Sequence, residues 1–128
     1  MAGQESDLLT EEIMEKYCIH LDYTIKETIE RINSNNNRIA IVLNENNKVV
    51  GVISQGDIIR ALSGGTGLYA RIDCIVKPNF IYLNKKDLPE AYKYFKKYKI
   101  TLLPVLDEEF HLFDVITLDN IFEYLEKA

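Results

Sequence analysis

Cysteine is scarce in this sequence of 128 residues. Cys18 and Cys74 are the two cysteines, and their separation excludes a CxxC motif. Small secreted domains held together by disulfides need more thiols than this. Two isolated thiols are typical of proteins kept in a reducing compartment, so we expect a cytoplasmic protein.

Long apolar runs and targeting signals are also missing. No stretch approaches the roughly 18 consecutive apolar residues that a membrane-spanning helix needs. Residues 1–7 are polar and lack the apolar centre of a secretion signal. We therefore expect neither a membrane segment nor a secreted precursor.

Positive charge is not in excess, because 15 Lys and Arg residues stand against 20 Asp and Glu residues and the net charge is −5. A protein that binds duplex nucleic acid usually carries a basic stripe, so this balance argues against nucleic acid as the main partner. With 47% apolar and 27% charged residues, the chain has the composition of a single globular domain.

The residue groups that catalysis requires are absent as well. The glycines of residues 63–67 (SGGTG) are not followed by the Gly-Lys-Ser/Thr of a phosphate-binding P-loop. His20 and His111 lack metal-ligand spacing, and no Cys–His or Ser–His–Asp grouping has a recognisable frame. We expect a protein that is not an enzyme and has no metal and no resident cofactor.

What the sequence does contain is an internal repeat with a shift of 63 residues, from Ser54 to Thr117. Residues 51–58 (GVISQGDI) return as residues 114–121 (DVITLDNI), and the register holds without a gap across most of each half. Each half predicts a short strand, a helix, two strands joined by a turn and a closing helix. The expected fold class is therefore α/β, with a β-α-β-β-α unit present twice.

The patterns predict specific elements in each half. Expected strands cover residues 18–20, 38–43 and 48–53, then 80–83, 101–106 and 110–116. One expected helix in each half follows a cap, Thr24 or Asp87, with a Glu three residues after the cap. A second, closing helix is expected over residues 55–62 in the first half and 118–126 in the second. Residues 8–17 and 68–76 are expected to form a leading helix for each repeat.

One unit alone would expose an apolar sheet face, so we expect the two units to pack through their sheets as one module. The expected organisation is a first repeat over about residues 8–63, a linker over 64–67 and a second repeat over 68–127.

The doubled unit resembles a cystathionine-β-synthase (CBS) domain pair, also called a Bateman module. The resemblance rests on residues 49–62 (VVGVISQGDIIRAL), 103–107 (LPVLD) and 37–42 (NRIAIV), and it covers roughly residues 12–127. It implies a regulatory, non-catalytic homodimer that binds an adenosine-containing ligand (AMP, ADP, ATP or S-adenosylmethionine) between the repeats.

Ser54 and Asp57 are the central candidates for ligand binding. A carboxylate accepts strong hydrogen bonds from ribose hydroxyls, and a hydroxyl at a helix start sits where free N–H groups favour a phosphate. In the family, the matching positions hold phosphate and ribose respectively. The same Ser-x-x-Asp pattern is also an ordinary helix cap that needs no ligand, and both interpretations stay open.

The resemblance implies further contacts in this site. Arg38 would reach the phosphates, Ala40 and Ile41 would give apolar wall and backbone contacts to an adenine, and Cys18 and Ile19 would contribute backbone. A solvated surface position explains Arg38 equally well, and core packing explains the four apolar residues equally well.

The second copy offers a weaker set of candidates: Thr117, Asn120, Thr101 and Pro104. Asn120 stands where the first copy has Asp57, so the charge at the ribose position is lost. Asp114 replaces Gly51 and adds bulk and negative charge near a phosphate path. We therefore predict one competent cleft, or none, rather than two.

Two alternatives to ligand sensing stay open. The module can be a ligand-free dimerisation scaffold, in which Ser54 and Asp57 act only as caps. It can also be a fragment of a larger enzyme such as a sugar-nucleotide transferase, since the pattern of residues 51–58 resembles theirs. The regulated enzyme would then be either fused to the module or a separate partner.

Overall fold

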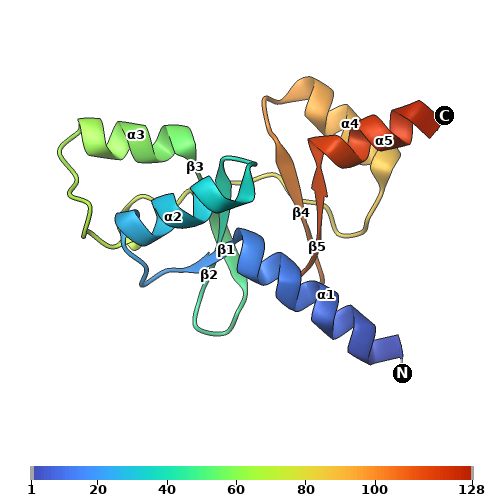
Figure 1. Ribbon diagram of the computed structural model, residues 1–128, viewed down its shortest axis with the longest axis horizontal. Coiled ribbons are helices and arrows are strands. Elements are labelled where there is room, and N and C mark those ends of the chain that lie inside the picture. Colours follow the sequence, from blue (N-terminus) through green and yellow to red (C-terminus); the bar gives the residue numbers. More distant parts are fainter. Residues whose placement is uncertain (1, 128) are drawn as a thin grey trace.

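The computed structural model describes residues 2–127, and the side chains of residues 10–127 (Figure 1). The elements in chain order are α1 (Ala2–Tyr17), β1 (Cys18–His20), α2 (Ile25–Asn35), β2 (Ile39–Leu43), β3 (Val49–Ser54), α3 (Gln55–Ser63), the 3-10 helix η1 (Ile72–Cys74), α4 (Leu88–Lys97), β4 (Leu102–Leu106), β5 (Leu112–Thr117) and α5 (Leu118–Lys127). Within the described part of the chain, no helix combines the length and the apolar character needed to cross a bilayer.

The strand pairing confirms the repeated α/β unit. The first sheet has the order β1-β2-β3, with β1 parallel to β2 and β2 antiparallel to β3. The second sheet is the antiparallel pair β4-β5. Equivalent residues begin both hairpins, because Ile39 pairs with Ser54 and Leu102 pairs with Thr117.

The caps expected from the sequence start the helices as predicted. Thr24 and Glu27 form a reciprocal capping box at the start of α2, and Ser54 and Asp57 do the same for α3. The Asp87 side chain accepts a hydrogen bond from the backbone N–H of Glu90 at the start of α4. Each cap satisfies backbone donors that a helix start otherwise leaves free.

Two predicted elements are wrong in extent. The strand expected over residues 80–83 is reduced to one parallel bridge between Leu83 and Val105, made by the hydrogen bonds from the Leu83 N–H to the Pro104 carbonyl and from the Leu106 N–H to the Leu83 carbonyl. The helix expected over residues 68–76 is only η1, because the carbonyls of Leu68 and Ala70 accept hydrogen bonds from α2 instead of forming helical ones.

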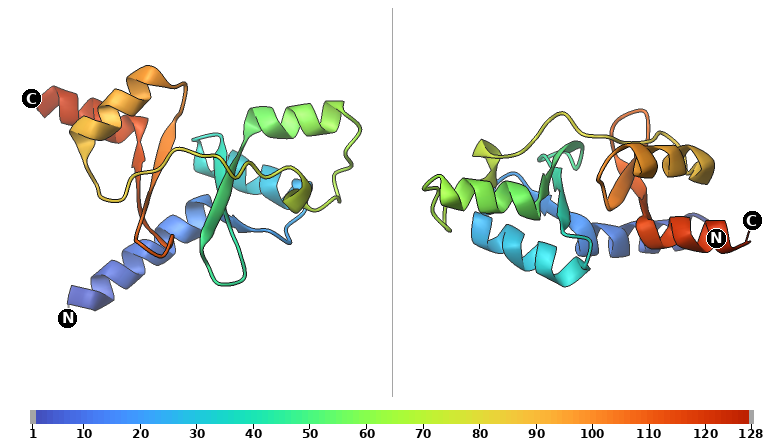
Figure 2. Two further views of the ribbon diagram at one scale, coloured as in Figure 1. Left: turned by 180° about the vertical axis from the view of Figure 1, so that it is seen from behind. Right: turned by 90° about the horizontal axis from the view of Figure 1, so that it is seen from above.

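The two repeats share a core between their sheets. Buried residues from both repeats form this cluster: Tyr17, Cys18, Ile41, Leu43 and Val49 from the first, and Leu102, Leu106, Leu112 and Val115 from the second. A separate apolar cluster lies within each repeat, under its own helices. Figures 1 and 2 show α2 and α3 at one end of the molecule and α4 and α5 at the other. The repeats therefore pack through their sheets as one module, as expected.

Each repeat is contacted by the segment that leads into the other. Helix α1 precedes the first repeat and contacts β5 of the second as well as α2. The connection between α3 and α4, residues 64–87, is longer than the linker expected from the sequence and is called the linker from here on. It pairs with β3 of the first repeat, where Val52 and Lys77 exchange two backbone hydrogen bonds of 3.3 Å. Gly51 permits this approach, because a side chain there would collide with the Lys77 carbonyl and the Val76 side chain.

Candidate functional site

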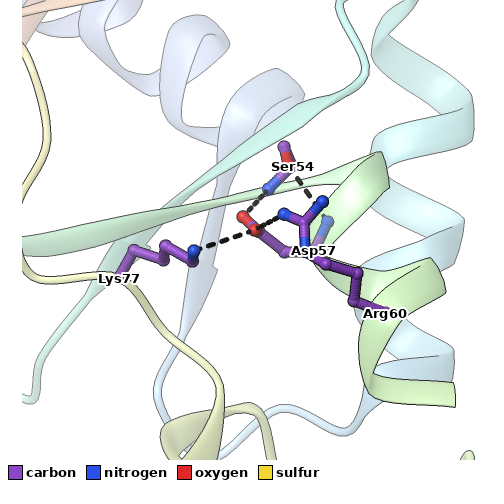
Figure 3. Close-up of polar contacts among 4 residues, drawn as sticks. All are labelled: Ser54, Asp57, Arg60 and Lys77. Atoms are coloured by element: carbon purple, nitrogen blue, oxygen red, sulfur yellow. Dashed lines mark hydrogen bonds and ion pairs between the residues drawn. The ribbon is translucent and has the colours of Figure 1, made fainter. Parts of the chain in front are cut away.

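The strongest candidate site lies where β3 turns into α3. Ser54 is the last residue of β3 and caps α3, and Asp57 lies in the first turn of that helix. The Ser54 N–H donates to Asp57 Oδ2 over 2.9 Å, and the Asp57 N–H donates to Ser54 Oγ over 3.2 Å (Figure 3). The cap interpretation of this pair is therefore confirmed, and it leaves the second carboxylate oxygen, Oδ1, for other partners.

Two cationic side chains form ion pairs with Oδ1 of Asp57. Arg60 reaches it from the next turn of α3, and the Lys77 ammonium reaches it from the linker at 3.6 Å (Figure 3). Gly56 makes room for the arginine, because a Cβ at position 56 would lie 3.3 Å from Arg60 Nη1. The Asp57 side chain is only 9% exposed, so these contacts hold a largely enclosed carboxylate.

The surroundings keep Asp57 ionised at neutral pH. Burial alone would raise the pKa of the Asp57 carboxyl. The hydrogen bonds from Ser54 and Arg60 and the charge of Lys77 outweigh that effect, so its pKa lies below the ordinary value of 3.8. The site therefore presents a charged acceptor, which is the group that binds ribose hydroxyls most strongly.

Arg38 lies beside this corner through its backbone. Its carbonyl accepts a hydrogen bond of 2.9 Å from the N–H of Gln55, the first residue of α3. The pairing of Ile39 with Ser54 brings the two segments together. Arg38 is exposed and has φ 60°, a left-handed conformation that costs a residue with a side chain on the order of 1 kcal/mol. The structure thus places the backbone of an exposed arginine at the start of the same helix.

The four apolar candidates lie inside the protein. Ile19, Ala40 and Ile41 have no exposed surface, and Cys18 is 5% exposed. The Ala40 and Ile41 side chains are used in core packing, so the structure leaves their backbone for the contacts expected with an adenine, and that role stays a prediction. Burial raises the pKa of the Cys18 thiol to about 12, so this cysteine is a neutral core residue.

The second copy retains the cap but not the charge. The Thr117 N–H donates to Asn120 Oδ1 over 2.9 Å, and the Asn120 N–H donates to Thr117 Oγ1 over 3.3 Å. Thr101 donates from its hydroxyl to the carbonyl of Asn37 in the first repeat. Pro104 is buried in β4, where its carbonyl accepts from the Leu83 N–H.

A pocket of about 490 Å³ lies between the repeats at this second position. Its lining includes Thr117, Asn120 and Asp114 from the second repeat and Asn37, Tyr17 and Lys16 from the segment around the first. Lys86, also in the lining, forms an ion pair of 3.3 Å with Asp114. The added negative charge that the sequence predicted here is thus paired with a cation.

Sequence reasoning missed the cations on Asp57. Arg60 follows Asp57 by three residues on one helix, a spacing that identifies neighbouring side chains. Lys77 is 20 residues away in the linker, and no local pattern points to it.

Among the described residues there is no group of three or more His, Cys, Asp or Glu side chains placed to hold a metal.

Comparison with known proteins gives a family match over most of the chain. Residues 7–64 and 72–127 each match the CBS domain model. An uncharacterised protein of Helicobacter pylori strain J99 is 34% identical over 91 residues, which is 70% of this chain and 28% of that protein. The magnesium transporter MgtE of Thermus thermophilus is 31% identical over 86 residues, 66% of this chain and 18% of the transporter. The chain therefore spans less than a third of either relative.

Solved structures share the fold at lower sequence identity. A CBS domain protein from Pyrobaculum aerophilum complexed with AMP has a TM-score of 0.71 and 19% identity, covering 89% of this chain and 93% of that one. The cytosolic domain of the Mg²⁺ channel MgtE in complex with ATP has a TM-score of 0.70 and 24% identity, covering 86% of this chain and 45% of that one. A CBS domain pair in complex with 5′-methylthioadenosine and S-adenosyl-L-methionine has a TM-score of 0.72 and 21% identity, covering 87% and 88%.

Proposed function

This chain belongs to the CBS domain family, and we propose that it is a non-catalytic regulatory module that binds an adenosine-containing ligand at the Ser54–Asp57 corner. The observation that carries the proposal is the ionised, largely enclosed Asp57 carboxylate at the start of α3. It lies beside a serine hydroxyl at a helix start, and the backbone of Arg38 adjoins the same turn, so one corner combines a ribose acceptor with groups that favour a phosphate.

The structural neighbours support the ligand class. Three proteins of the same fold are described in complex with AMP, with ATP, or with 5′-methylthioadenosine and S-adenosyl-L-methionine. All of these ligands contain adenosine, and they differ in what replaces or extends the 5′-phosphate. The choice of ligand in this chain then depends on the groups that surround Asp57.

Isothermal titration calorimetry with AMP, ADP, ATP and S-adenosylmethionine tests the proposal. The informative variant is Asp57→Asn, because Asn120 shows that an asparagine keeps the cap hydrogen bonds of this motif. We expect at least one ligand to bind the wild-type chain, and the variant to lose at least ten-fold in affinity while staying folded. No heat with any ligand, or equal binding by the variant, would overturn the proposal.

A second candidate function is a ligand-free dimerisation scaffold, and one observation favours it. Ile59 on α3 is 58% exposed, and Phe122, its equivalent on α5, is 52% exposed. Leu62 and Leu125 form a second equivalent pair of exposed residues. Large exposed apolar side chains that recur on both repeats are typical of a surface covered by a partner. A two-fold homodimer that sets α3 of one protomer against α5 of its partner would cover both positions.

Analytical ultracentrifugation distinguishes the two candidate functions. A dimer that Ile59→Glu and Phe122→Glu each disrupt supports homodimerisation, which is compatible with ligand sensing. A dimer together with no ligand-induced thermal shift supports the scaffold alone. A marked thermal shift with an adenine nucleotide would exclude the purely structural role.

We propose that the module regulates either a longer chain that contains it or a separate protein. In the matched relatives, one of them a magnesium transporter, the similar segment is under a third of the chain. The regulated protein would be a transporter, as in that relative, or a sugar-nucleotide transferase, as the pattern of residues 51–58 suggests. In either, the ligand acts only if it binds two arrangements of the repeats with different affinity. The reading frame around the gene distinguishes a fused partner from a separate one.

A further inference from the structure

Lys77 connects the linker between the repeats to the candidate ribose-binding carboxylate. Its ammonium lies 3.6 Å from Asp57 Oδ1, the oxygen that does not take part in the cap of α3 (Figure 3). Oδ2 already accepts from the Ser54 N–H, so a ribose that binds Asp57 through two hydroxyls would use Oδ1 as well. A ribose hydroxyl at Oδ1 would then compete with the Lys77 ammonium for this oxygen.

The backbone of Lys77 is held in place while its side chain is free to move. Lys77 and Val52 exchange two backbone hydrogen bonds, and the linker crosses β3 at Gly51 with no room for a side chain. The Lys77 side chain is nevertheless 58% exposed. The ammonium can thus swing to another partner close to Asp57 without any movement of the linker.

We propose that Lys77 is a specificity-determining residue, which makes the Ser54–Asp57 site select adenosine ligands that carry a 5′-phosphate over the uncharged nucleoside. The inference rests on the proposed function. Adenosine would take the Asp57 oxygen from Lys77 and offer the ammonium nothing in return. A nucleotide would take the same oxygen but place a phosphate next to Ser54, where the displaced ammonium can pair with it.

Arg60 shares the same carboxylate oxygen but has a different role in this exchange. It belongs to α3 itself, so its movement stays within the helix that carries Asp57. Lys77 comes from the linker, and its transfer from Asp57 to a phosphate changes a contact between the first repeat and the segment leading into the second. The preference for phosphate then depends on a side chain from outside α3.

The test compares the affinities of AMP and adenosine for the wild-type chain, Lys77→Met and a matched control. Lys93→Met is the control, because Lys93 also forms an ion pair of 3.6 Å with a carboxylate, that of Glu90, and its side chain is 74% exposed on α4. Titration calorimetry gives each affinity, and thermal unfolding confirms that all three proteins fold.

We expect Lys77→Met to bind adenosine more tightly and AMP no more tightly than the wild-type chain does, so that the ratio of the AMP affinity to the adenosine affinity falls about 1.4- to 5-fold, the worth of one exposed ion pair. Loss of the pair with Asp57 in the free protein affects both ligands equally, so only the pair with the phosphate changes the ratio. Lys93→Met should leave the ratio unchanged.

The outcomes separate the two proposals. If AMP binds the wild-type chain but Lys77→Met keeps the wild-type ratio, or loses both ligands equally, the role of Lys77 is overturned and the proposed function stands. If neither AMP, ADP, ATP, S-adenosylmethionine nor adenosine binds the wild-type chain, both proposals fail together.

Discussion

Asn120 holds Thr117 at the start of α5 in the same way that Asp57 holds Ser54 at the start of α3. The hydrogen bond from the backbone N–H to the side-chain oxygen measures 2.9 Å in both repeats. A neutral amide therefore suffices to close this cap. The cap therefore does not require the negative charge of Asp57. Because the second repeat has asparagine at the equivalent position, Asp57→Asn removes the charge and keeps the cap hydrogen bonds.

The first prediction concerns the stability contributed by this cap. Asp57→Ala removes the hydrogen bond from the Ser54 N–H to the carboxylate and the contacts of Arg60 and Lys77 with it, but keeps the Asp57 N–H bond to Ser54 Oγ, and should lower the free energy of unfolding by about 1 kcal/mol. Asp57→Asn keeps the hydrogen bonds seen at Asn120 and should lower it by less. Urea denaturation measures both values, and an equal loss in the two variants would show that the charge, not the cap, stabilises this corner.

The second prediction concerns acid. The pKa of Asp57 is lower in the folded chain than its ordinary value of 3.8, so its contribution to stability is complete above that value and is lost as pH falls through the folded-state pKa. The stability advantage of the wild-type chain over Asp57→Asn should therefore shrink between pH 5 and about pH 2. Urea denaturation of both proteins across this range checks it, and a constant or growing advantage would contradict the assignment.

The third prediction concerns the linker that crosses β3. Gly51→Ala would push a methyl group into the Lys77 carbonyl and the Val76 side chain, and overpacking of this kind costs about 1–3 kcal/mol. Gly67→Ala is the control, because a Cβ there meets nothing within 4 Å. Thermal unfolding should show a lower midpoint for Gly51→Ala and little change for Gly67→Ala. Similar midpoints for the two variants would mean that the linker does not press on β3.

The fourth prediction concerns the turn between β4 and β5. Phe110 has φ 67°, whereas Asn47, its equivalent in the first repeat, adopts φ 59° with a side chain that tolerates this conformation. The centroids of the Phe110 and Tyr82 rings lie 5.4 Å apart, but Phe110 is 41% exposed. The packing of the ring therefore offsets only part of the free-energy cost of the positive φ. Phe110→Asn should therefore stabilise the chain, by up to about 1 kcal/mol.

Phe113→Asn is the matched control for this turn. Phe113 is 42% exposed as well, but it lies within β5 and has no positive φ. Replacement of an aromatic residue in a strand by asparagine should destabilise the chain. Denaturation of both variants checks the contrast, and a destabilised Phe110→Asn would show that the ring contact outweighs the backbone strain.

The sequence was informative where structure depends on neighbours along the chain. The 63-residue repeat predicted the α/β unit, and the short spacing between Thr24 and Glu27 or between Ser54 and Asp57 predicted how α2 and α3 begin. These features follow from side-chain periodicity and from hydrogen bonds that span one helical turn, so no long-range information is needed.

Only the tertiary structure decided what surrounds the candidate site. It buried Ala40 and Ile41, which have an apolar character that suits a ligand wall and a protein core equally well. It brought Lys77 to Asp57 across 20 residues, and it opened a pocket between the repeats beside Asn120. Which side chains meet there depends on how the two sheets pack and where the linker crosses them, and no short stretch of the sequence encodes that arrangement.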